Sequence, residues 1–333
     1  MQKTCDSGNP YTELERGLHA ALETYCNVHR GSGYNSMVTT HLFEQARAVV
    51  LEYLGLKKGK HQVIFCSPRG AELLKARLEP ESYQSVSSLD FGLSLGVRAL
   101  AVDRKALQGG APFQTGGGTT RLVSPGWVIW AKAPDRFEAG TPAIINVIAF
   151  ARALCLIRKS GNAIFLNSTS EKLSADKILY NDELEKYSGR ELLEKLRHTL
   201  IGRNIIVPTA EGARPYINLD YSASTPTFTP VWNTVCQTWR QPLQIQQEII
   251  HEVRSICSEM LGASMDTYEL IFTSNTTEAI NLAAESLSLE SDPGTEPAVL
   301  STILEHTSND LPWRMVPKIS VIRLEVDNEG FWI

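Results

Sequence analysis

The stretch FTSNTTEAINLAAESL, residues 272–287, decides how the C-terminal part of this chain folds. It starts with an apolar segment typical of a strand, continues through a polar turn, and then places apolar residues at helical spacing from about Thr277. Such a helix start presents unpaired backbone N–H groups and hydroxyls at its positive end, where a phosphate can bind. The alternative is that Thr276 or Thr277 only caps the helix.

The elements before this turn have a counterpart earlier in the chain. A helix from about Gln246 to Leu261 and the strand ELIFTS, residues 269–274, repeat the pattern of a helix from about Thr39 to Leu54 and the strand QVIFCS, residues 62–67. Six matched pairs are each 207 positions apart: Arg47 and Arg254, Leu54 and Leu261, Gly55 and Gly262, Ile64 and Ile271, Phe65 and Phe272, Ser67 and Ser274. Chance similarity between helix–strand patterns is the alternative, but the constant spacing favours a partial duplication.

A duplication divides the chain into three expected regions. These are a degenerate first copy over residues 1–158, a charged helical linker or insert over residues 159–215, and the front half of a second copy over residues 216–333. The other expected elements are a helix over residues 13–25, an ambiguous β-leaning segment over 85–102, a strand around 127–131, an apolar helix over 144–157, charged helix-prone segments over 171–186 and 189–200, and a strand over 216–220.

The composition is that of a globular protein, with 43% hydrophobic and 21% charged residues. A formal net charge of -5 and a pI of about 5.9 argue against a nucleic-acid-binding surface. The most apolar segment, residues 144–157, contains Arg152 and is too short to span a bilayer, so no membrane association is expected. The six cysteines form no CxxC pair, which favours a reducing compartment. We expect a cytoplasmic protein, and no metal site.

Four ordered motifs in the second copy resemble the cysteine desulfurase and class V aminotransferase family. They are YINLDYSASTP at residues 216–226, TSNTTEAIN at 273–281, EHTSNDLPW at 305–313 and VIRLEVDNEG at 321–330. The resemblance implies an α/β fold like the large domain of fold-type I pyridoxal-phosphate enzymes, with a mostly parallel sheet flanked by helices. It also implies pyridoxal 5′-phosphate as cofactor, an amino acid as substrate of the complete enzyme, and a homodimer as a candidate assembly.

The resemblance also assigns roles to residues of the second copy. Thr276 and Thr277 match the turn that holds the cofactor phosphate in this family. His306 matches the histidine whose ring stacks on the pyridine of the cofactor. A neutral imidazole suits that place because it covers a flat aromatic ring without competing for its charges. The alternative for His306 is a surface or core histidine without a cofactor role.

The first copy resembles the family in two places, YCNVHRGSGYNS at residues 25–36 and the segment from Gly116 to Pro142. Thr141, in the FEAGTP sequence, matches a threonine that reaches the cofactor phosphate of the partner subunit in the family. The other interpretation is that FEAGTP only starts the apolar helix, because Pro142 suits a first helical turn.

The chain also departs from the family pattern. The first copy reads SPRGAE, residues 67–72, where the second reads SNTTEA, and it is too short to contain the family's middle section. That section supplies the stacking histidine, an aspartate on the pyridine nitrogen and the Schiff-base lysine. No SxHK-like segment for that lysine occurs before Ile333, and Lys132 and Lys318 stand at other places. Catalytic residues are therefore not assigned, and we expect the chain to be incomplete as an enzyme.

Two functions are consistent with these patterns. The first is a pyridoxal-phosphate-dependent protein of the aminotransferase class V or cysteine desulfurase type, and the second is a non-catalytic scaffold or dimerisation partner that keeps the fold. A nucleotide or sugar-phosphate binder using the glycine loop at residues 116–118 rests on a weaker motif. If the first copy completes the site of the second, residues 136–142 should pack toward the Thr276–Thr277 turn, within one chain or across a dimer.

Overall fold

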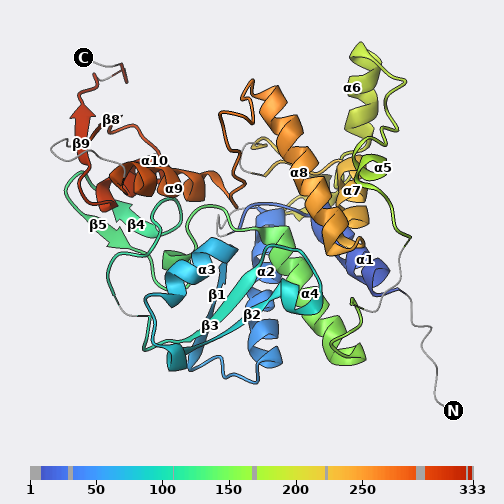
Figure 1. The fold of residues 1–333 in the computed structure, drawn as a ribbon, viewed down its shortest axis with the longest axis horizontal. Coiled ribbons are helices and arrows are strands. Elements are labelled where there is room, and N and C mark those ends of the chain that lie inside the picture. Colours follow the sequence, from blue (N-terminus) through green and yellow to red (C-terminus); the bar gives the residue numbers. More distant parts are fainter. Residues whose placement is uncertain are drawn as a thin grey trace. The chain divides into compact units, whose positions relative to one another are not determined.

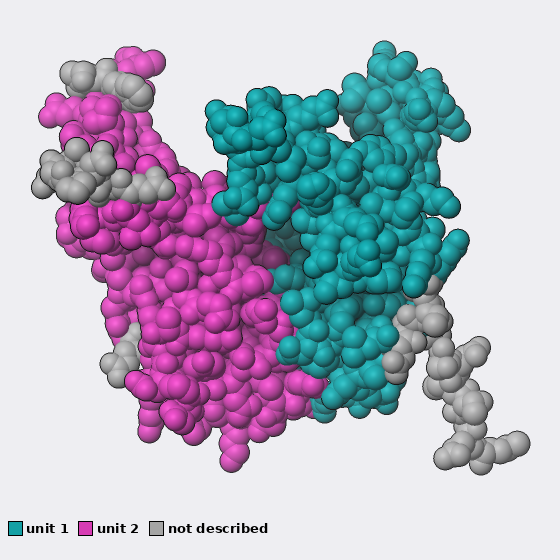
Figure 2. Space-filling view, in the orientation of Figure 1, with its two compact units in different colours: residues 1–49, 88–96, 144–271 teal, residues 50–87, 97–143, 272–333 magenta. Residues whose placement is uncertain are grey.

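The computed structural model describes residues 9–28, 33–107, 109–166, 171–221, 224–289, 297–327 and 329–331. The chain forms two compact units, which Figure 2 shows in different colours. Unit 1 consists of Met1–Val49, Ser88–Gly96 and Ile144–Ile271, and unit 2 consists of Val50–Ser87, Val97–Ala143 and Phe272–Ile333. Each unit is therefore assembled from segments that lie far apart in the sequence.

Unit 1 is mainly helical (Figure 1). Its helices are α1 (Pro10–Glu23), α4 (Ile144–Ser160), α5 (Ala175–Leu179), α6 (Gly189–His198), α7 (Thr229–Trp239) and α8 (Leu243–Met260), together with most of α2 (Tyr34–Tyr53). The Asn9 side chain caps α1 by accepting a hydrogen bond from the Tyr11 amide at 2.9 Å. Helices α1 and α4 pack together and supply completely buried leucines and Phe150. An exposed antiparallel hairpin is formed by β6 (Ile206–Thr209) and β7 (Gly212–Pro215).

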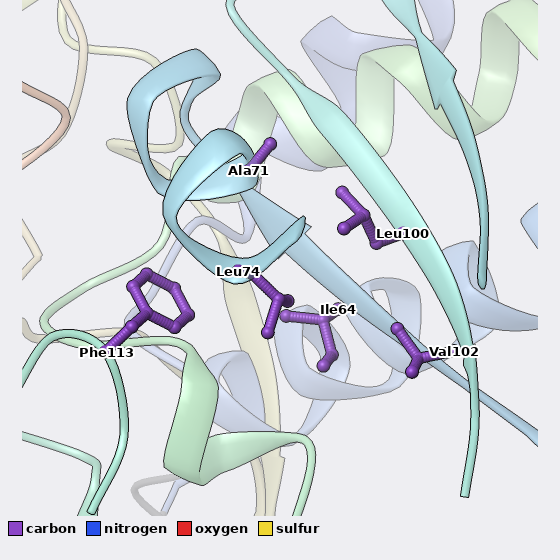
Figure 3. Close-up of a cluster of buried hydrophobic side chains, with 6 residues drawn as sticks. All are labelled: Ile64, Ala71, Leu74, Leu100, Val102 and Phe113. Atoms are coloured by element: carbon purple, nitrogen blue, oxygen red, sulfur yellow. The ribbon is translucent and has the colours of Figure 1, made fainter. Parts of the chain in front are cut away.

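Unit 2 contains a three-stranded antiparallel sheet in the order β1-β3-β2. Its strands are β1 (His61–Cys66), β2 (Tyr83–Ser87) and β3 (Arg98–Asp103), and helix α3 (Pro68–Lys75) packs against β1 and β3. The four central residues of β1 and of β3 are all buried, which explains their continuous apolar sequences. Figure 3 shows the core between helix and sheet, which is made of Ile64, Ala71, Leu74, Leu100, Val102 and Phe113.

The other strands of unit 2 form two separate pairs. Strands β4 (Thr120–Val123) and β5 (Val128–Trp130) make an antiparallel hairpin, and β8 (Ala298–Thr302) and β9 (Ser320–Leu324) pair in parallel. Helix α9 (Thr276–Leu289) precedes β8, and α10 (Thr307–Met315) connects β8 to β9. Short 3-10 segments lie at Pro80–Ser82 and Asp135–Phe137 in this unit, and at Ser88–Phe91 in unit 1.

The expected α/β class is confirmed, but the expected mostly parallel sheet is not what the sheets of the described residues show. Among them, β8 and β9 are the parallel pair, whereas β1, β2 and β3 and both hairpins are antiparallel. The connections explain the difference. A parallel pair needs a crossover of a dozen or more residues, and α10 provides one between β8 and β9. Only four residues separate β4 from β5, so these strands can only turn back on each other.

Most expected helices are confirmed with shifted ends. The segment over residues 13–25 is α1, that over 144–157 is α4, and α2 and α8 end just before Gly55 and Gly262. Of the two charged segments, residues 189–200 form α6, whereas residues 171–186 contain only the short helix α5. Within the described part of the chain, no helix has both the length and the apolar character needed to cross a membrane.

Two expected strands are wrong. Residues 216–220 and 269–274 have no strand conformation, and Ile271 and Phe272 are 61% and 50% exposed. An apolar segment becomes a strand only where another strand pairs with it, and neither segment has such a partner among the described residues. Residues 29–32, in the NVHRG-like loop, and residues 222 and 223, in the YINLDYSASTP motif, lie outside the described residues.

Candidate functional site

The candidate site lies in unit 2, at the start of α9. Asn275 precedes the first residue of this helix and caps it, since its Oδ1 atom accepts a hydrogen bond of 2.9 Å from the Glu278 amide. The Asn275 carbonyl also accepts a bond of 3.2 Å from the Ala279 amide. The helix predicted to start near Thr277 is therefore confirmed, and the residue that caps it is Asn275.

Glu278 places a carboxylate in the first turn of α9, although its side chain is almost completely buried. It accepts hydrogen bonds from the Ser274 amide at 2.9 Å, from the Ser274 hydroxyl, and from the Ser67 hydroxyl at 2.6 Å. Burial is the largest influence and would raise the pKa of Glu278. The hydrogen bonds from Ser274 and Ser67, together with the nearby charge of Arg69, outweigh it and lower that pKa. The carboxylate is therefore held in its ionised form.

The hydroxyl of Thr277 is turned toward α10. Thr277 is only 3% exposed, and its Oγ1 atom donates a hydrogen bond of 2.8 Å to the hydroxyl of Ser308. The same Ser308 oxygen accepts a bond of 3.1 Å from the Gly117 amide. Ser308 thus joins the starts of α9 and α10 to the glycine loop of residues 116–118.

The glycine loop approaches both helix starts so closely that a side chain would not fit. A Cβ atom built on Gly116 would lie 2.4 Å from Cγ2 of Thr277, and one on Gly117 would lie 3.1 Å from the Ser308 hydroxyl. Gly116 also has a φ of +147°, a value that side chains rarely allow. The QTGGGTT cluster therefore serves close packing of backbone against the two helices.

Residues 139–141 of the FEAGTP segment lie against the same helix start. The Asn275 Nδ2 atom donates hydrogen bonds of 3.1 Å to the carbonyls of both Ala139 and Thr141. Between these two residues, Gly140 has a φ of +80°, and its amide donates to the carbonyl of Gly117 at 2.8 Å. The expected packing of this segment toward the Thr276–Thr277 turn is observed within one chain.

His306 is the residue before α10 and caps that helix. Its Nδ1 atom accepts a hydrogen bond of 3.1 Å from the Ser308 amide, so in this geometry Nδ1 carries no proton. The ring is exposed, and one edge lies against Gly117, whose built Cβ would be 3.2 Å from Cε1 of His306. The imidazole therefore lies beside Gly117, and its Nε2 atom takes no part in capping α10.

Asn281 makes a further connection between α9 and the glycine loop. Its Oδ1 atom accepts from the Thr115 amide at 3.1 Å, and its Nδ2 atom donates to the Thr115 carbonyl at 2.8 Å. Beside this pair, the Thr115 hydroxyl and the Gln114 amide nitrogen are buried and have no hydrogen-bond partner among the described residues. Hydrogen bonds to the Thr115 backbone thus hold the loop before Gly116. The two buried side-chain atoms remain without a hydrogen-bond partner among the described residues.

The structure brings together the elements that carry all four residues proposed from the sequence. Thr276 and Thr277 start α9, His306 caps α10, and the Asn275 bonds place Thr141 beside α9. Sequence reasoning missed Asn275, Ser308 and Asn281. An asparagine directly before a helix is a strong N-cap signal, so Asn275 could have been found. The bonds from Ser308 to Gly117 and from Asn281 to Thr115 each span more than 160 residues and have no local signal.

The geometry at the start of α9 fits the phosphate end of pyridoxal phosphate. The side chains of Thr276 and Thr141 are exposed beside the positive end of a long helix, as an anion site requires. The Thr277 hydroxyl, in contrast, is committed to Ser308. No lysine stands in a matched position, and the exposed Lys132 and Lys318 belong to other segments of unit 2.

Potential metal ligands and one buried thiol can be described from the same structure. Among the described residues, no group of three or more His, Cys, Asp and Glu side chains is arranged to hold a metal ion. Cys236, in unit 1, is buried, and burial, reinforced by the negative charge of Glu15, raises the pKa of its thiol to about 12. This thiol therefore stays protonated and unreactive near neutral pH.

Comparison with known proteins identifies the family of this chain. Residues 94–205 and 217–331 match the sequence model of the aminotransferase class V family. Over 66 residues the chain is 41% identical to a probable cysteine desulfurase of Ureaplasma parvum, covering 20% of this chain and 15% of the relative. Over 90 residues it is 33% identical to a probable cysteine desulfurase of Pyrococcus abyssi, covering 26% and 21%. The matched stretches therefore span less than a quarter of these relatives.

A solved structure is similar over a larger share of the chain. The apo cysteine desulfurase of Thermococcus onnurineus NA1 matches with a TM-score of 0.36 and 18% identity, covering 55% of this chain and 73% of that one. The family match rests on the sequence model, whose two matched stretches together make up well over half of the chain. The chain belongs to the aminotransferase class V family.

Proposed function

We propose that this chain is a cysteine desulfurase-like member of its family that binds pyridoxal phosphate at the start of α9 and acts on an amino-acid substrate. Class V aminotransferases and cysteine desulfurases are pyridoxal-phosphate-dependent. The observation that carries the proposal is the placement of residues 139–141 on the capped start of α9 through the two Asn275 bonds. Two segments that resemble the family's phosphate-binding residues thereby meet in one unit.

The residues of this chain would act mainly by binding and orientation. Thr276, the backbone at the positive end of α9 and Thr141 would hold the phosphate, and His306 would cover one side of the ring. Ser308, which bonds to both Thr277 and the Gly117 amide, holds Thr277 in place at the start of α9. When bound, the cofactor supplies the electron-withdrawing ring on which the amino-acid chemistry of the family depends.

The first copy would then complete the site of the second within a single chain. Thr141 and the glycine loop come from residues 1–158, whereas Thr276 and His306 come from residues 216–333. This proposal uses the duplication inferred from the constant spacing of 207 positions, with residues 159–215 as the insert between the copies. A homodimer would be compatible with it but is not needed to bring these segments together.

A second candidate function is a non-catalytic scaffold with the family's fold. The observation that favours it is the self-contained packing of the helix start, where Thr277 is buried against Ser308 and Gly140 fills the space beside Asn275. In such a protein, the same polar contacts would serve only to hold unit 2 together.

Binding of pyridoxal phosphate to the purified chain separates the two functions. The proposal expects weak binding that the double change Thr276→Ala, Thr277→Ala lowers about tenfold or more, because a hydrogen bond to a charged group contributes about 1.5–3 kcal/mol. The matched control is Thr225→Ala, whose exposed hydroxyl bonds to the Tyr221 carbonyl in unit 1. Equal binding by wild type and the double variant would leave only the scaffold.

Reduction with borohydride tests the absence of covalent attachment. Without a matched lysine, the chain loaded with pyridoxal phosphate should show no lysine that borohydride modifies in a one-to-one ratio. Peptide mapping would examine Lys132 and Lys318 first, because both belong to unit 2. A single stoichiometrically modified lysine would contradict this part of the proposal and restore a covalent mechanism.

A further inference from the structure

We infer that Asn275 is a positioning residue that holds residues 139–141 at the start of α9 and thereby sets the place of Thr141. The capping of α9 and the holding of this segment use different atoms of the same amide. Oδ1 accepts from the Glu278 amide, and Nδ2 donates to the carbonyls of Ala139 and Thr141. The benefit for phosphate binding rests on the proposed function, but the placement of the segment does not.

The geometry around Gly140 shows how tightly the segment is held. A Cβ atom built on Gly140 would lie 2.6 Å from Oδ1 of Asn275 and 2.8 Å from Oγ1 of Thr277. With its φ of +80°, Gly140 turns the backbone so that the carbonyls before and after it both reach the same side-chain nitrogen. An amide –NH₂ group has two hydrogens, so Asn275 can satisfy both carbonyls at once.

Further hydrogen bonds link the 139–141 segment to the glycine loop and to the starts of α9 and α10. The Gly140 amide bonds to the Gly117 carbonyl, the Gly117 amide bonds to Ser308, and Thr277 bonds to the same Ser308 oxygen. Asn275 supplies the link between α9 and the 139–141 segment. Since the other links do not connect residues 139–141 to α9 directly, loss of the Nδ2 donors should free the segment at this point.

The chemistry of asparagine, aspartate and serine allows the two roles to be separated. All three are good helix N-caps, so Asn275→Asp and Asn275→Ser should keep the start of α9. Aspartate replaces the donor –NH₂ with an ionised oxygen that faces two carbonyl oxygens, and serine is too short to bond both carbonyls. Both variants therefore remove the hold on residues 139–141 while the capping acceptor remains.

Hydrogen exchange of the full chain, read by peptide, tests the inference without any ligand. We expect peptides covering residues 136–142 to exchange about tenfold faster or more in Asn275→Asp and Asn275→Ser, since two hydrogen bonds are lost. Peptides of α9 and of the β1-β3-β2 sheet should keep their wild-type rates. The matched control is Asn309→Asp on α10, whose amide bonds to Glu305 and should leave residues 136–142 unchanged.

Dependence on pH gives a readout that a capping role alone would not produce. At low pH the new carboxyl group of the Asn275→Asp variant is protonated and can donate to one carbonyl again. The exchange of residues 136–142 in this variant, relative to wild type at the same pH, should therefore partly return to the wild-type rate as the pH falls from about 7 to about 3.5, below the ordinary aspartate pKa of about 3.9. The Asn275→Ser variant, which has no titrating group there, should show no recovery.

The outcomes distinguish this inference from the proposed function. Unchanged exchange of residues 136–142 in both variants would overturn the positioning role, as would loss of protection throughout unit 2 in both, which would indicate a general structural residue. Pyridoxal phosphate is the probe for the second question. If the segment is released and wild type binds no cofactor, the positioning role stands and the proposed function fails.

Discussion

The two helix–glycine–strand segments on which the proposed duplication rests differ in structure after their helices, and they are called the two copies below. In both copies the helix ends in the same way, and the glycine adopts a left-handed conformation with φ of +69° at Gly55 and +65° at Gly262. The amides of Leu56 and Ala263 bond back to carbonyls at matched positions, at 2.8 and 2.9 Å. Beyond the glycine, the first copy forms the buried strand β1, whereas the matched residues 269–274 form no strand.

This difference separates what a local sequence decides from what its surroundings decide. The helix end depends on a few neighbouring residues, so equal sequences give equal caps. A strand needs a partner, and β1 has β3 along its whole length, with Ile64 opposite Leu100 and Phe65 opposite Ala99. In the second copy, Ile271 is left exposed because no described strand pairs with this segment.

Truncating the matched isoleucines should give the largest difference between the copies. Ile64→Ala removes a completely buried side chain from the core of unit 2 and should lower the free energy of unfolding by about 2–5 kcal/mol. Ile271→Ala removes a side chain that is 61% exposed and should change it by at most about 0.5 kcal/mol. Urea unfolding of both variants measures this, and similar losses at both positions would show that residues 269–274 are packed like β1.

Ionisation of Glu278 should give the next largest effect, and it has no counterpart in the first copy, where Ala71 stands at the matched position. Because the pKa of Glu278 is lowered on folding from its usual 4.5, its contribution to stability is present above about pH 4.5 and is lost as pH falls through the folded-state pKa. Glu278→Gln should therefore be less stable than wild type at about pH 7, by about 1.5–3 kcal/mol.

The stability of the two proteins should converge as the pH is lowered below 4.5. Unfolding curves for wild type and Glu278→Gln at a series of pH values would show this. The control is Glu72→Gln beside Ala71, because Glu72 is exposed and, among the described residues, pairs with Lys75 on the surface. A constant difference between wild type and Glu278→Gln from about pH 7 to about pH 3 would contradict an ionised, buried carboxylate.

The sequence predicted the parts of the fold that depend on neighbouring residues. It located α1, α2, α4, α8 and the start of α9, because apolar spacing, glycines and capping residues mark them. It failed for residues 216–220 and 269–274, where the pattern of a strand is present but the pairing strand is not. The family led us to expect a mostly parallel sheet, whereas most described strand pairs are antiparallel, because the direction of pairing depends on the connections between strands.

The candidate site also contains residues that the sequence identifies and residues that it does not. Motif resemblance brought Thr276, Thr277, His306 and Thr141 to attention, and the elements that carry them do meet in unit 2. The residues that join these elements, such as Ser308, bond to backbone groups more than 100 positions away. A backbone carbonyl or amide has no sequence signature, so these connections could not be predicted from the residue types alone.

Replacing the two matched glycines should have nearly equal effects, in contrast to the isoleucines. A Cβ atom built on Gly55 or Gly262 meets nothing within 4 Å, so only the backbone conformation opposes a side chain. Gly55→Ala and Gly262→Ala should each cost about 1–2 kcal/mol of unfolding free energy. Gly59→Ala, which also has open space but no left-handed φ, should cost less. A difference above about 1 kcal/mol between the matched pair would show that tertiary contacts, not the local cap, decide this position.

The smallest expected effect separates the matched serines Ser67 and Ser274, whose hydroxyls both donate to the Glu278 carboxylate. Ser67 also caps α3 by accepting from the Gly70 amide at 3.0 Å. In Ser274→Ala the backbone amide still donates to Glu278. We therefore expect unfolding free energies lowered by about 1–2 kcal/mol for Ser67→Ala and about 0.5–1 kcal/mol for Ser274→Ala.

A double-mutant cycle with Glu278→Gln assigns these losses to their causes. When Ser274→Ala is combined with Glu278→Gln, its loss should largely disappear, because it arises from a bond to the charged carboxylate. Most of the Ser67→Ala loss should remain in the same background, because the cap of α3 does not involve Glu278. If instead both losses vanish together, Ser67 stabilises unit 2 only through the second copy's carboxylate, and the capping role of Ser67 in the first copy contributes nothing.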